Sequence, residues 1–149
     1  MIKIVPIEDK YLDHAADLFS RVYADEEGPY DPKMAYKRIV DNLKTGLSYS
    51  FVAISDNKPV GEIINKVFWA EDGWNLWVDS LQVEPEYQKQ GIAKELFKSA
   101  RDRALKDGAT GIVMIVDISK QFPKDWYEKM GLEKTSWVTY DAKIGDVKI

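Results

Sequence analysis

The sequence predicts a single mixed α/β domain over residues 1–149, in which helices cover a sheet that is partly parallel and partly antiparallel. Three observations lead to this fold class. The chain has 149 residues, of which 45% are hydrophobic, and this is enough to build one core. Apolar residues recur at helical spacing in some segments and alternate in others. In the middle of the chain, a strand, a tight turn, a helix and a second strand follow one another, which is the unit that makes neighbouring strands parallel.

The first half of the chain predicts one strand, two helices and a three-stranded meander. Residues 2–7, IKIVPI, form the opening strand, and a helix follows over residues 8–23. A second helix begins after Asp31, a capping residue followed by Pro32, and ends at Gly46. Strands over residues 48–55, 60–69 and 74–83 are joined by the turns DNKP and AEDG, so we expect them to run antiparallel.

The second half returns to the alternation of helix and strand. A helix begins near Gly91 and runs to Lys106 with apolar residues along one face. Residues 110–116, TGIVMIV, are a continuous apolar run that indicates a buried strand, parallel to residues 74–83. A short helix at residues 124–131 and two late strands, 133–140 and 146–149, complete the chain. The predicted order is therefore β-α-α-β-β-β-α-β-α-β-β.

Composition excludes several classes of protein. The net charge is −4, which disfavours nonspecific binding to nucleic acid, because neutralising phosphates needs a concentrated basic surface. The absence of cysteine removes disulfides, thiolate metal sites and thiol nucleophiles, and no metal site is predicted. No apolar run approaches the ~20 residues of a membrane span, so we expect a cytoplasmic protein with no membrane partner. The single histidine, His14, is expected on the surface of the first helix without a role.

The turn YQKQGIAKEL, residues 87–96, begins a helix without Ser, Thr, Asp or Asn to cap it. The first backbone N–H groups of a helix lack partners within it, and they attract anions together with the helix dipole. Gly91 allows a ligand to approach the backbone closely, and the turn follows the carboxyl end of a strand, where α/β sheets bind ligands. A phosphate is the expected ligand. The patterns of P-loop hydrolases and of dinucleotide folds are both missing from the sequence.

Gln88 to Ala93 form the pattern Gln-x-x-Gly-x-Ala after the strand and turn LQVEPEY. This segment resembles the pyrophosphate loop of the GNAT superfamily of acyl-CoA-dependent N-acetyltransferases, whose pattern is Gln/Arg-x-x-Gly-x-Gly/Ala. The resemblance extends to the order of elements over nearly the whole chain, and to DWYEKMGLE, which is similar to the late Tyr-x-x-x-Gly segment of the family. It implies a GNAT-like fold with splayed central parallel strands and acetyl-CoA as the acyl donor.

The resemblance also implies which residues bind coenzyme A. The diphosphate is expected on the backbone N–H groups of the turn, with added charge from Lys89. The pantetheine arm is expected to pair with the preceding strand, where an N–H polarises the acyl carbonyl. The residues are Leu81, Gln82 and Val83 on the strand and Gln88, Lys89, Gln90, Gly91, Ile92, Ala93 and Lys94 in the turn.

Amide formation from a thioester needs a neutral amine, a donor for the oxyanion and a proton for the leaving thiolate. Tyr127 lies where the family usually carries its proton donor, and a phenol keeps its proton at neutral pH yet can pass it to a thiolate. The alternative is a core tyrosine packed beside Trp126. Phe at this position would separate the two interpretations.

Three carboxylates are candidates for the base that deprotonates the amine. Asp79 is expected, from a period of two, on the same face as Trp77, Leu81 and Val83. Glu62 lies on the neighbouring strand, and Asp117 ends the parallel strand. Each of them is equally compatible with a solvated side chain or a member of an ion pair.

The acceptor site is predicted from acidic and aromatic residues that could hold a cationic amine by charge and by cation–π contact. The candidates are Glu26, Glu27, Tyr30, Trp69 and Trp77. Solvated loops are commonly acidic too, so this interpretation has a plain alternative. The segment SKQFPKDW before Tyr127 departs from the family, which usually has Asn and small residues there, and is expected to reshape the acceptor side.

The resulting functional hypothesis is an N-acetyltransferase that moves an acetyl group from acetyl-CoA to a primary amine, on a small molecule or a peptide, by direct attack in a ternary complex. Two alternatives remain: a noncatalytic acyl-CoA-binding regulatory domain, and an acyltransferase that uses a longer acyl group or makes an ester. The late segment KTSWVTY carries Trp137 and Val138 as an exposed edge would, and indicates a homodimer.

Overall fold

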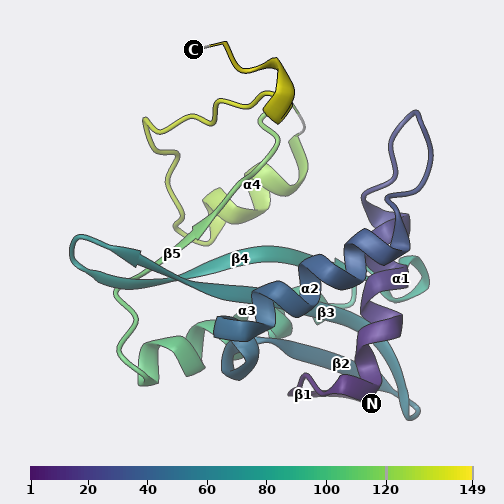
Figure 1. Ribbon diagram of the computed structural model, residues 1–149. Helices are drawn as coiled ribbons and strands as arrows, with labels where there is room; N and C mark the ends of the chain where they lie inside the picture. Colours follow the sequence, from purple (N-terminus) through teal and green to yellow (C-terminus); the bar gives the residue numbers. More distant parts are fainter. Residues whose placement is uncertain (120, 149) are drawn as a thin grey trace. The chain divides into compact units, whose positions relative to one another are not determined.

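The computed structural model describes residues 1–119 and 121–148, in two compact units, Met1–Ile115 and Val116–Ile149. The first unit contains one five-stranded sheet in the order β1-β2-β3-β4-β5 (Figure 1). Its elements are β1 Ile2–Pro6, α1 Leu12–Val22, α2 Pro32–Gly46, β2 Phe51–Ser55, β3 Lys58–Ala70, β4 Gly73–Val83, α3 Ile92–Lys106 and β5 Gly111–Met114. The second unit contains α4, Gln121–Lys129. Short 3₁₀ turns lie at Asp9–Tyr11, Leu47–Tyr49, Pro85–Tyr87 and Ile144–Asp146.

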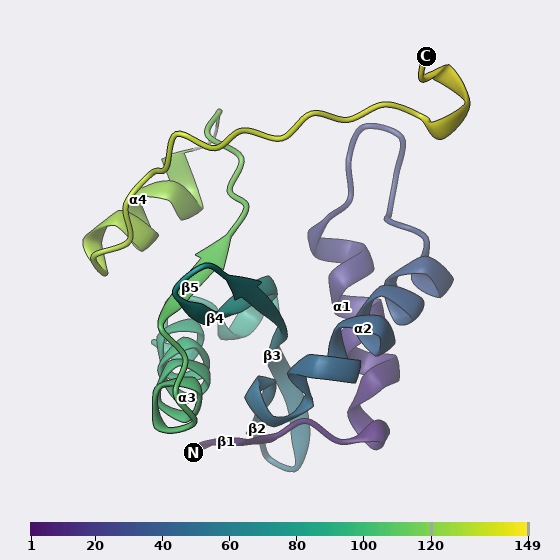
Figure 2. The same ribbon diagram turned by 60° about the vertical axis from the view of Figure 1, so that its left-hand side comes forward.

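The first unit has three layers, with α1 and α2 on one face of the sheet and α3 on the other (Figure 2). Apolar stripes on the helices account for this arrangement. Phe19 of α1 and Ile39 of α2 are buried against Ile64 of β3 in one cluster. Across the sheet, α3 buries Leu96 and Ala100. The fold class predicted from the sequence is thus confirmed.

The antiparallel meander of β2, β3 and β4 forms as predicted, but β4 contains a bulge that the sequence did not reveal. Ile64 of β3 pairs with Ser80, whereas the next residue, Asn65, pairs with Val78. Asp79 is therefore an extra residue on β4, and the strict alternation of side chains is interrupted there. Asp79 bonds to Arg38 of α2 and therefore lies on the side of the sheet that α1 and α2 cover. This position corrects the face that a period of two predicted for Asp79.

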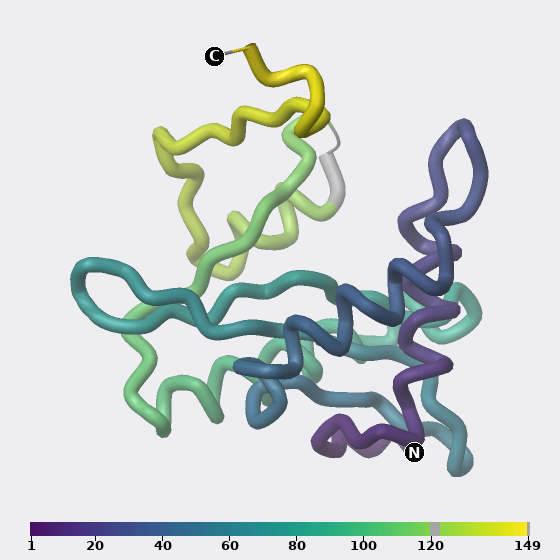
Figure 3. Tube along the Cα trace, in the orientation of Figure 1, coloured from purple at the N-terminus to yellow at the C-terminus, as the bar shows by residue number. Residues whose placement is uncertain are grey.

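The parallel pairing of β4 with β5 is confirmed, and it covers only four residue pairs, from Asn75 with Gly111 to Val78 with Met114. Beyond Val78, β4 continues for five more residues without a partner strand of the first unit on that side. The trace of the β3–β4 hairpin, the longest antiparallel pair of the sheet, can be followed in Figure 3. β5 is half-buried, which corrects the expected buried strand over residues 110–116, because it is the last strand of the sheet and has one neighbour.

The predicted start of α2 is confirmed in atomic detail, while its end has another cause than expected. The Asp31 side chain accepts a hydrogen bond from the Lys33 N–H at 2.8 Å, as an N-cap should. Gly46 ends α2 without a left-handed conformation. A Cβ at Gly46 would lie 1.7 Å from the Asn65 carbonyl oxygen, so the glycine is required because α2 approaches β3 closely.

The two late strands predicted at residues 133–140 and 146–149 are wrong for the residues that the structure describes. Residues 133–140 and 146–148 belong to no ladder, and Ile149 lies outside the described residues. Trp137 and Tyr140 are 87% and 95% exposed. An alternating pattern is stable as a strand only when its backbone finds a partner, and in this chain these segments have none.

Across residues 1–119 and 121–148, every helix is too short or too polar to cross a bilayer.

Candidate active site

The turn between β4 and α3 presents backbone N–H groups at the positive end of a helix. β4 ends at Val83, and a 3₁₀ turn, Pro85–Tyr87, follows. The first bond within α3 joins the Glu95 N–H to the Gly91 carbonyl at 3.1 Å. The N–H groups of Ile92, Ala93 and Lys94 therefore precede the first helical bond, and the helix dipole adds positive potential there. Such a turn favours an anion, and phosphate binding at this turn stays a prediction.

Gly91 is required by conformation and by open space, and not by packing between helix and strand. Its φ is +83°, in the left-handed region that side chains rarely adopt. A Cβ placed on Gly91 would meet no heavy atom within 4 Å. The space in front of the turn is therefore open to a ligand, and Lys89, which also has a positive φ of 61°, completes the curvature of the turn.

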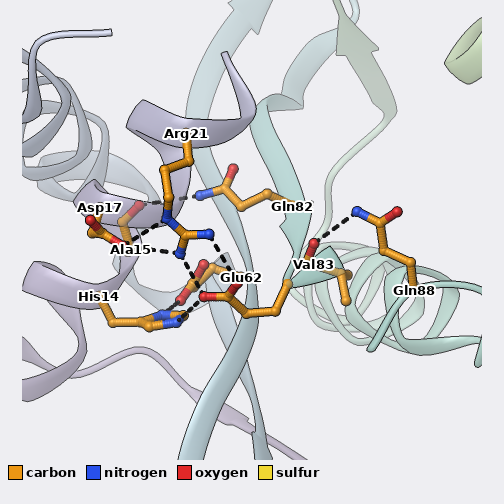
Figure 4. Close-up of polar contacts among 9 residues, drawn as sticks. His14, Ala15, Asp17, Arg21, Glu62, Gln82, Val83 and Gln88 are labelled. Atoms are coloured by element: carbon orange, nitrogen blue, oxygen red, sulfur yellow. Dashed lines mark hydrogen bonds and ion pairs between the residues drawn. The ribbon is translucent and has the colours of Figure 1, made fainter. Parts of the chain in front are cut away.

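Gln88 shapes the turn with its side chain. Its Nε2 donates to the Val83 carbonyl at 3.0 Å and ties the turn back to the end of β4 (Figure 4). Gln90 makes a longer bond of the same kind to the Glu86 carbonyl. The glutamine of the Gln-x-x-Gly-x-Ala pattern thus acts as a brace, and the backbone is left to face an anion.

The edge of β4 that leads into this turn holds Leu81, Gln82 and Val83, the residues predicted to pair with the pantetheine arm. Within the first unit, β3 covers one side of these residues, and no strand covers the other. Tyr23, which follows α1, reaches this edge. Burial raises the pKa of its phenol and the Asp79 carboxylate raises it further, while a hydrogen bond with the Leu81 backbone opposes both.

Asp79 is engaged in an ion pair. Both of its carboxylate oxygens accept hydrogen bonds from Arg38, from Nε and Nη2, each at 2.9 Å. The Arg38 guanidinium also lies over the Phe19 ring, 5.3 Å from its centroid. A carboxylate held on both oxygens by a guanidinium is poorly placed to accept another proton. Asp117, the third candidate, is exposed and accepts bonds from the Ser119 N–H and hydroxyl.

Glu62 is completely buried in β3, and it contacts a histidine that the sequence analysis had placed on the surface. Its Oε1 bonds to the Nδ1 of His14 on α1, and the Nε2 of the same ring lies 3.1 Å from Glu84 Oε1 (Figure 4). The side chain of His14 is only 22% exposed. The expectation that His14 is a surface residue is therefore wrong.

The network continues from Glu84 to the end of α1. Arg21 donates from Nη2 and Nη1 to the two Glu84 oxygens, at 2.7 and 3.0 Å, and from Nε to Asp17 at 2.9 Å. Glu84 directly precedes the 3₁₀ turn, so the network joins α1, β3 and the start of the turn between β4 and α3. We refer to Glu62, His14, Glu84 and Arg21 as the α1–β3 network.

The groups of the α1–β3 network shift one another's pKa values. Burial raises the pKa of the Glu62 carboxyl, although the bond to His14 opposes the rise. Burial would lower the pKa of His14, but the two carboxylates beside it outweigh burial, so that its pKa is raised. The bonds from Arg21 lower the pKa of Glu84. His14 therefore lies between one carboxyl that tends to hold a proton and one that remains charged.

Tyr127 lies in α4 of the second unit, half-buried, with its ring 5.0 Å from that of Trp126 in an edge-to-face contact. The helix ends just after it. The Leu132 N–H bonds to the Tyr127 carbonyl and the Gly131 N–H bonds to the Glu128 carbonyl, while Gly131 has a φ of +92°. This pairing is the Schellman motif, and it explains the spacing of tyrosine and glycine in Tyr-x-x-x-Gly.

The five candidate acceptor residues lie in separate places. Glu26 and Glu27 are exposed in the connection between α1 and α2, and Tyr30 at its end packs edge-on against Phe19 at 5.0 Å. Trp69 is at the tip of the β3–β4 hairpin, at the opposite end of the sheet in Figure 1. The face of Trp77 is already covered by Lys66, whose Nζ lies 4.9 Å from the ring centroid. One small acceptor cannot contact all five.

Sequence reasoning missed His14, Arg21, Arg38 and Glu84. Apart from the Arg21–Asp17 pair within α1, their partners are 41 to 70 residues away in the chain, so no local pattern contains them. One signal was available: His14 and Arg21 are seven residues apart on one helix and therefore share a face. The structure describes no cluster of side chains that could hold a metal ion within residues 1–119 and 121–148.

Solved structures of similar fold cover nearly the whole chain. A possible acetyltransferase from Clostridium difficile 630 has 21% identity and a TM-score of 0.81, over 97% of this chain and 98% of its own. An aminoglycoside N-acetyltransferase in complex with CoA has 15% identity and a TM-score of 0.77, over 97% and 95% of the two chains. Naa50 from Arabidopsis thaliana, in complex with the bisubstrate analogue CoA-Ac-MVNAL, has 19% identity and a TM-score of 0.70, over 90% and 84%.

A comparison with curated protein sequences gives no match. At these identities the structural neighbours establish the fold alone. The family model described as "Acetyltransferase (GNAT) family" matches residues 12–132, which include β4, the Gly91 turn, α3 and α4. The chain therefore belongs to the GNAT family of acetyltransferases.

Proposed function

We propose that this protein is an N-acetyltransferase that transfers an acetyl group from acetyl-CoA to a primary amine by direct attack in a ternary complex. One observation carries the proposal. An edge of β4 without a partner strand in the first unit leads into a turn whose N–H groups face open space at Gly91. An extended amide-containing arm that ends in a diphosphate fits this pair of features in order, because the edge pairs with amides and the turn binds the anion.

The fit to coenzyme A is supported by the chemistry of the residues present. The turn, Gln88 to Lys94, would hold the diphosphate through its backbone, and Lys89 would add charge. Leu81, Gln82 and Val83 would orient the pantetheine arm. When bound, acetyl-CoA supplies an activated thioester. A backbone N–H of this edge would polarise the acyl carbonyl.

Proton transfer is assigned to Glu62 and Tyr127. Of the two strand carboxylates, Asp79 has both oxygens bound by Arg38, whereas Glu62 is buried and its Oε2 lacks a partner among the described residues. Glu62 is therefore the better base, acting through a water because its side chain is fully buried. Tyr127 is proposed to protonate the leaving thiolate, as its place in the family motif implies.

For the acceptor we propose a cationic amine held near the acidic α1–α2 connection. Glu26 and Glu27 are exposed there, and Asp25 accepts a bond from the Glu27 N–H at 2.8 Å, which orders the loop. Two neighbours of similar fold were solved with compounds that resemble such acceptors, an acetylneamine analogue and the peptide analogue MVNAL. Aminoglycosides and peptide amines are therefore sensible first members of a substrate panel.

The test is to mix the protein with acetyl-CoA and a panel of amines, and to follow the release of free thiol. Turnover with at least one amine, together with an acetylated product of the expected mass, is the expected result. Binding of CoA by calorimetry without turnover on any amine would favour the noncatalytic regulatory alternative. Faster turnover with longer acyl-CoAs than with acetyl-CoA would favour the alternative of an acyltransferase that uses a longer acyl group.

A further inference from the structure

The assignment of Glu62 as the base raises a question about where the proton goes. Glu62 is 0% exposed, so it cannot return a proton to solvent by itself. A base that does not lose its proton is inactive for the next turnover. The proton must therefore leave Glu62 through a group that contacts it.

We propose that His14 is a positioning and relay residue, which takes the amine's proton from Glu62 and releases it to solvent. The inference rests on the proposed acetyl transfer and deepens it, because it adds a residue to the same reaction. It also accounts for a partly exposed imidazole between two carboxylates, an arrangement that stability alone does not require.

The contacts of His14 suit a relay. Nδ1 bonds to the buried Glu62 carboxylate, and Nε2 lies 3.1 Å from Glu84 Oε1. The ring is 22% exposed, while the Glu62 side chain is 0% exposed, so the imidazole is the one described side chain bonded to Glu62 that also reaches solvent. An imidazole can accept a proton on one nitrogen and release one from the other.

A row of unpartnered polar atoms extends from Glu62 towards the β4 edge. Glu62 Oε2, Gln82 Oε1 and Ser80 Oγ are buried and have no hydrogen-bond partner among the described residues. Gln82 is the cross-strand partner of Glu62, and Ser80 lies two residues earlier on the same face of β4. Buried polar groups of this kind are normally satisfied by ordered water, each molecule making about three bonds. We place bridging water there, between the bulge at Asp79 and Glu62.

The proton balance of the relay is simple. The ammonium of the acceptor loses one proton through the bridging water to the Glu62 carboxylate. Glu62 then passes a proton to Nδ1 of His14, and Nε2 releases one to solvent beside Glu84. One proton has moved from the amine to solvent, and no electron has been transferred. His14 starts with its proton on Nε2. The starting tautomer is restored when the ring turns away from Glu62, so that the Nδ1 proton is lost to water while Nε2 takes one up.

The charged groups around His14 make the transient imidazolium stable enough to form. Glu62 faces the ring from β3 and Glu84 from the segment after β4, while Asp17 and Arg21 lie one and two turns further along α1. Arg21 neutralises part of the charge of Glu84. The raised pKa of His14 agrees with two carboxylates outweighing one guanidinium and burial.

The first experiment tests the pairing without activity. His14 is the only histidine, so its ring gives one set of histidine signals by NMR without assignment. The expected result is a titration above the ordinary histidine range in the wild type, which falls towards that range in Glu62→Gln because one of the two carboxylates is gone. A wild-type titration that Glu62→Gln leaves unchanged would overturn the pairing and the relay.

The second experiment tests the role. His14→Ala should lower kcat by at least about tenfold, with a smaller change in the KM for acetyl-CoA. Added imidazole should restore kcat, and substituted imidazoles should do so in proportion to their basicity. The matched control is Arg103→Gln, which removes an exposed ion pair with Asp107 on α3, outside the α1–β3 network. It should leave kcat and its pH profile unchanged.

Two results would overturn the relay while leaving acetyl transfer intact. One is a His14→Ala variant with the wild-type kcat and pH profile. The other is rescue by imidazoles that does not depend on their basicity, because a ring that only fills space would act in that way. The absence of transfer from wild type to every amine would instead overturn the proposed function, and the relay with it.

Discussion

At the scale of single residues, Glu62 and Asp79 are carboxylates on neighbouring strands with opposite surroundings. Glu62 is buried, one of its oxygens has no partner within residues 1–119 and 121–148, and burial raises its pKa. Asp79 has both oxygens bound by Arg38. The same residue type therefore has different expected functions, because a free, desolvated carboxylate is the better proton acceptor.

Isosteric amides test this difference. Glu62→Gln should lower kcat by about 10²-fold or more, since general base catalysis typically contributes 10²–10⁴-fold. Asp79→Asn should lower the melting temperature through loss of the Arg38 pair, with a change in kcat below about tenfold. Steady-state kinetics and thermal unfolding of both variants provide the measurement. The opposite order of kcat effects would make Asp79 the base.

Tyr127→Phe keeps the ring, its contact with Trp126 and the helix end, and removes only the hydroxyl. If Tyr127 protonates the thiolate, kcat should fall by at least about tenfold, while CoA affinity and stability stay the same. The loss should be smaller with thioesters of more acidic thiols. Tyr140→Phe, in the same unit and 95% exposed, is the control. A wild-type kcat, under conditions where chemistry limits turnover, would make Tyr127 structural.

At the scale of elements, the Gly91 turn offers a test with an internal control. Gly91 and Gly108 lie at the two ends of α3, both with positive φ, +83° and +96°, and neither has an atom within 4 Å of a Cβ. Valine at either position should therefore carry a similar backbone strain, roughly 1–3 kcal/mol.

Only Gly91→Val should also block the diphosphate. Calorimetry should show CoA affinity reduced about tenfold or more for Gly91→Val and unchanged for Gly108→Val, with similar losses of melting temperature. Equal affinities in two folded variants would remove the phosphate from this turn.

Elements that depend on a local sequence pattern could be predicted, and features that depend on distant segments could not. Apolar periodicity and caps are local, so α1, α2, α3 and the meander were found, with Asp31 capping as expected. The bulge at Asp79 depends on how β4 pairs with β3, which the sequence of β4 alone does not specify. Residues 133–140 alternate as a strand does, but an alternating pattern does not supply the partner strand that a ladder needs. The loop motif was found because its residues are contiguous. The α1–β3 network was missed because it joins segments up to 70 residues apart.

At the scale of the whole molecule, exposed apolar residues in the second unit predict self-association. Trp137 is 87% exposed and Val138 72%. Large apolar side chains in an extended segment are typical of a strand that pairs with another copy. Light scattering at micromolar concentration should give the mass of a dimer, and Trp137→Glu should shift it towards a monomer. A monomeric wild type would contradict the prediction.

The β4 edge at Leu81 to Val83 also has a consequence for the protein before it meets its donor. Unpaired strand backbone recruits other strands, and elsewhere proteins protect such edges with charge, proline or a cover. Here the protective cover would be the ligand itself. The amide hydrogens of Leu81 and Val83, which alternate with the β3-bonded amides of Gln82 and Glu84, should exchange with deuterated solvent quickly in the free protein and slowly with saturating CoA. Solutions heated without CoA should turn turbid sooner than solutions with it, so that the supply of donor would govern how long each molecule survives.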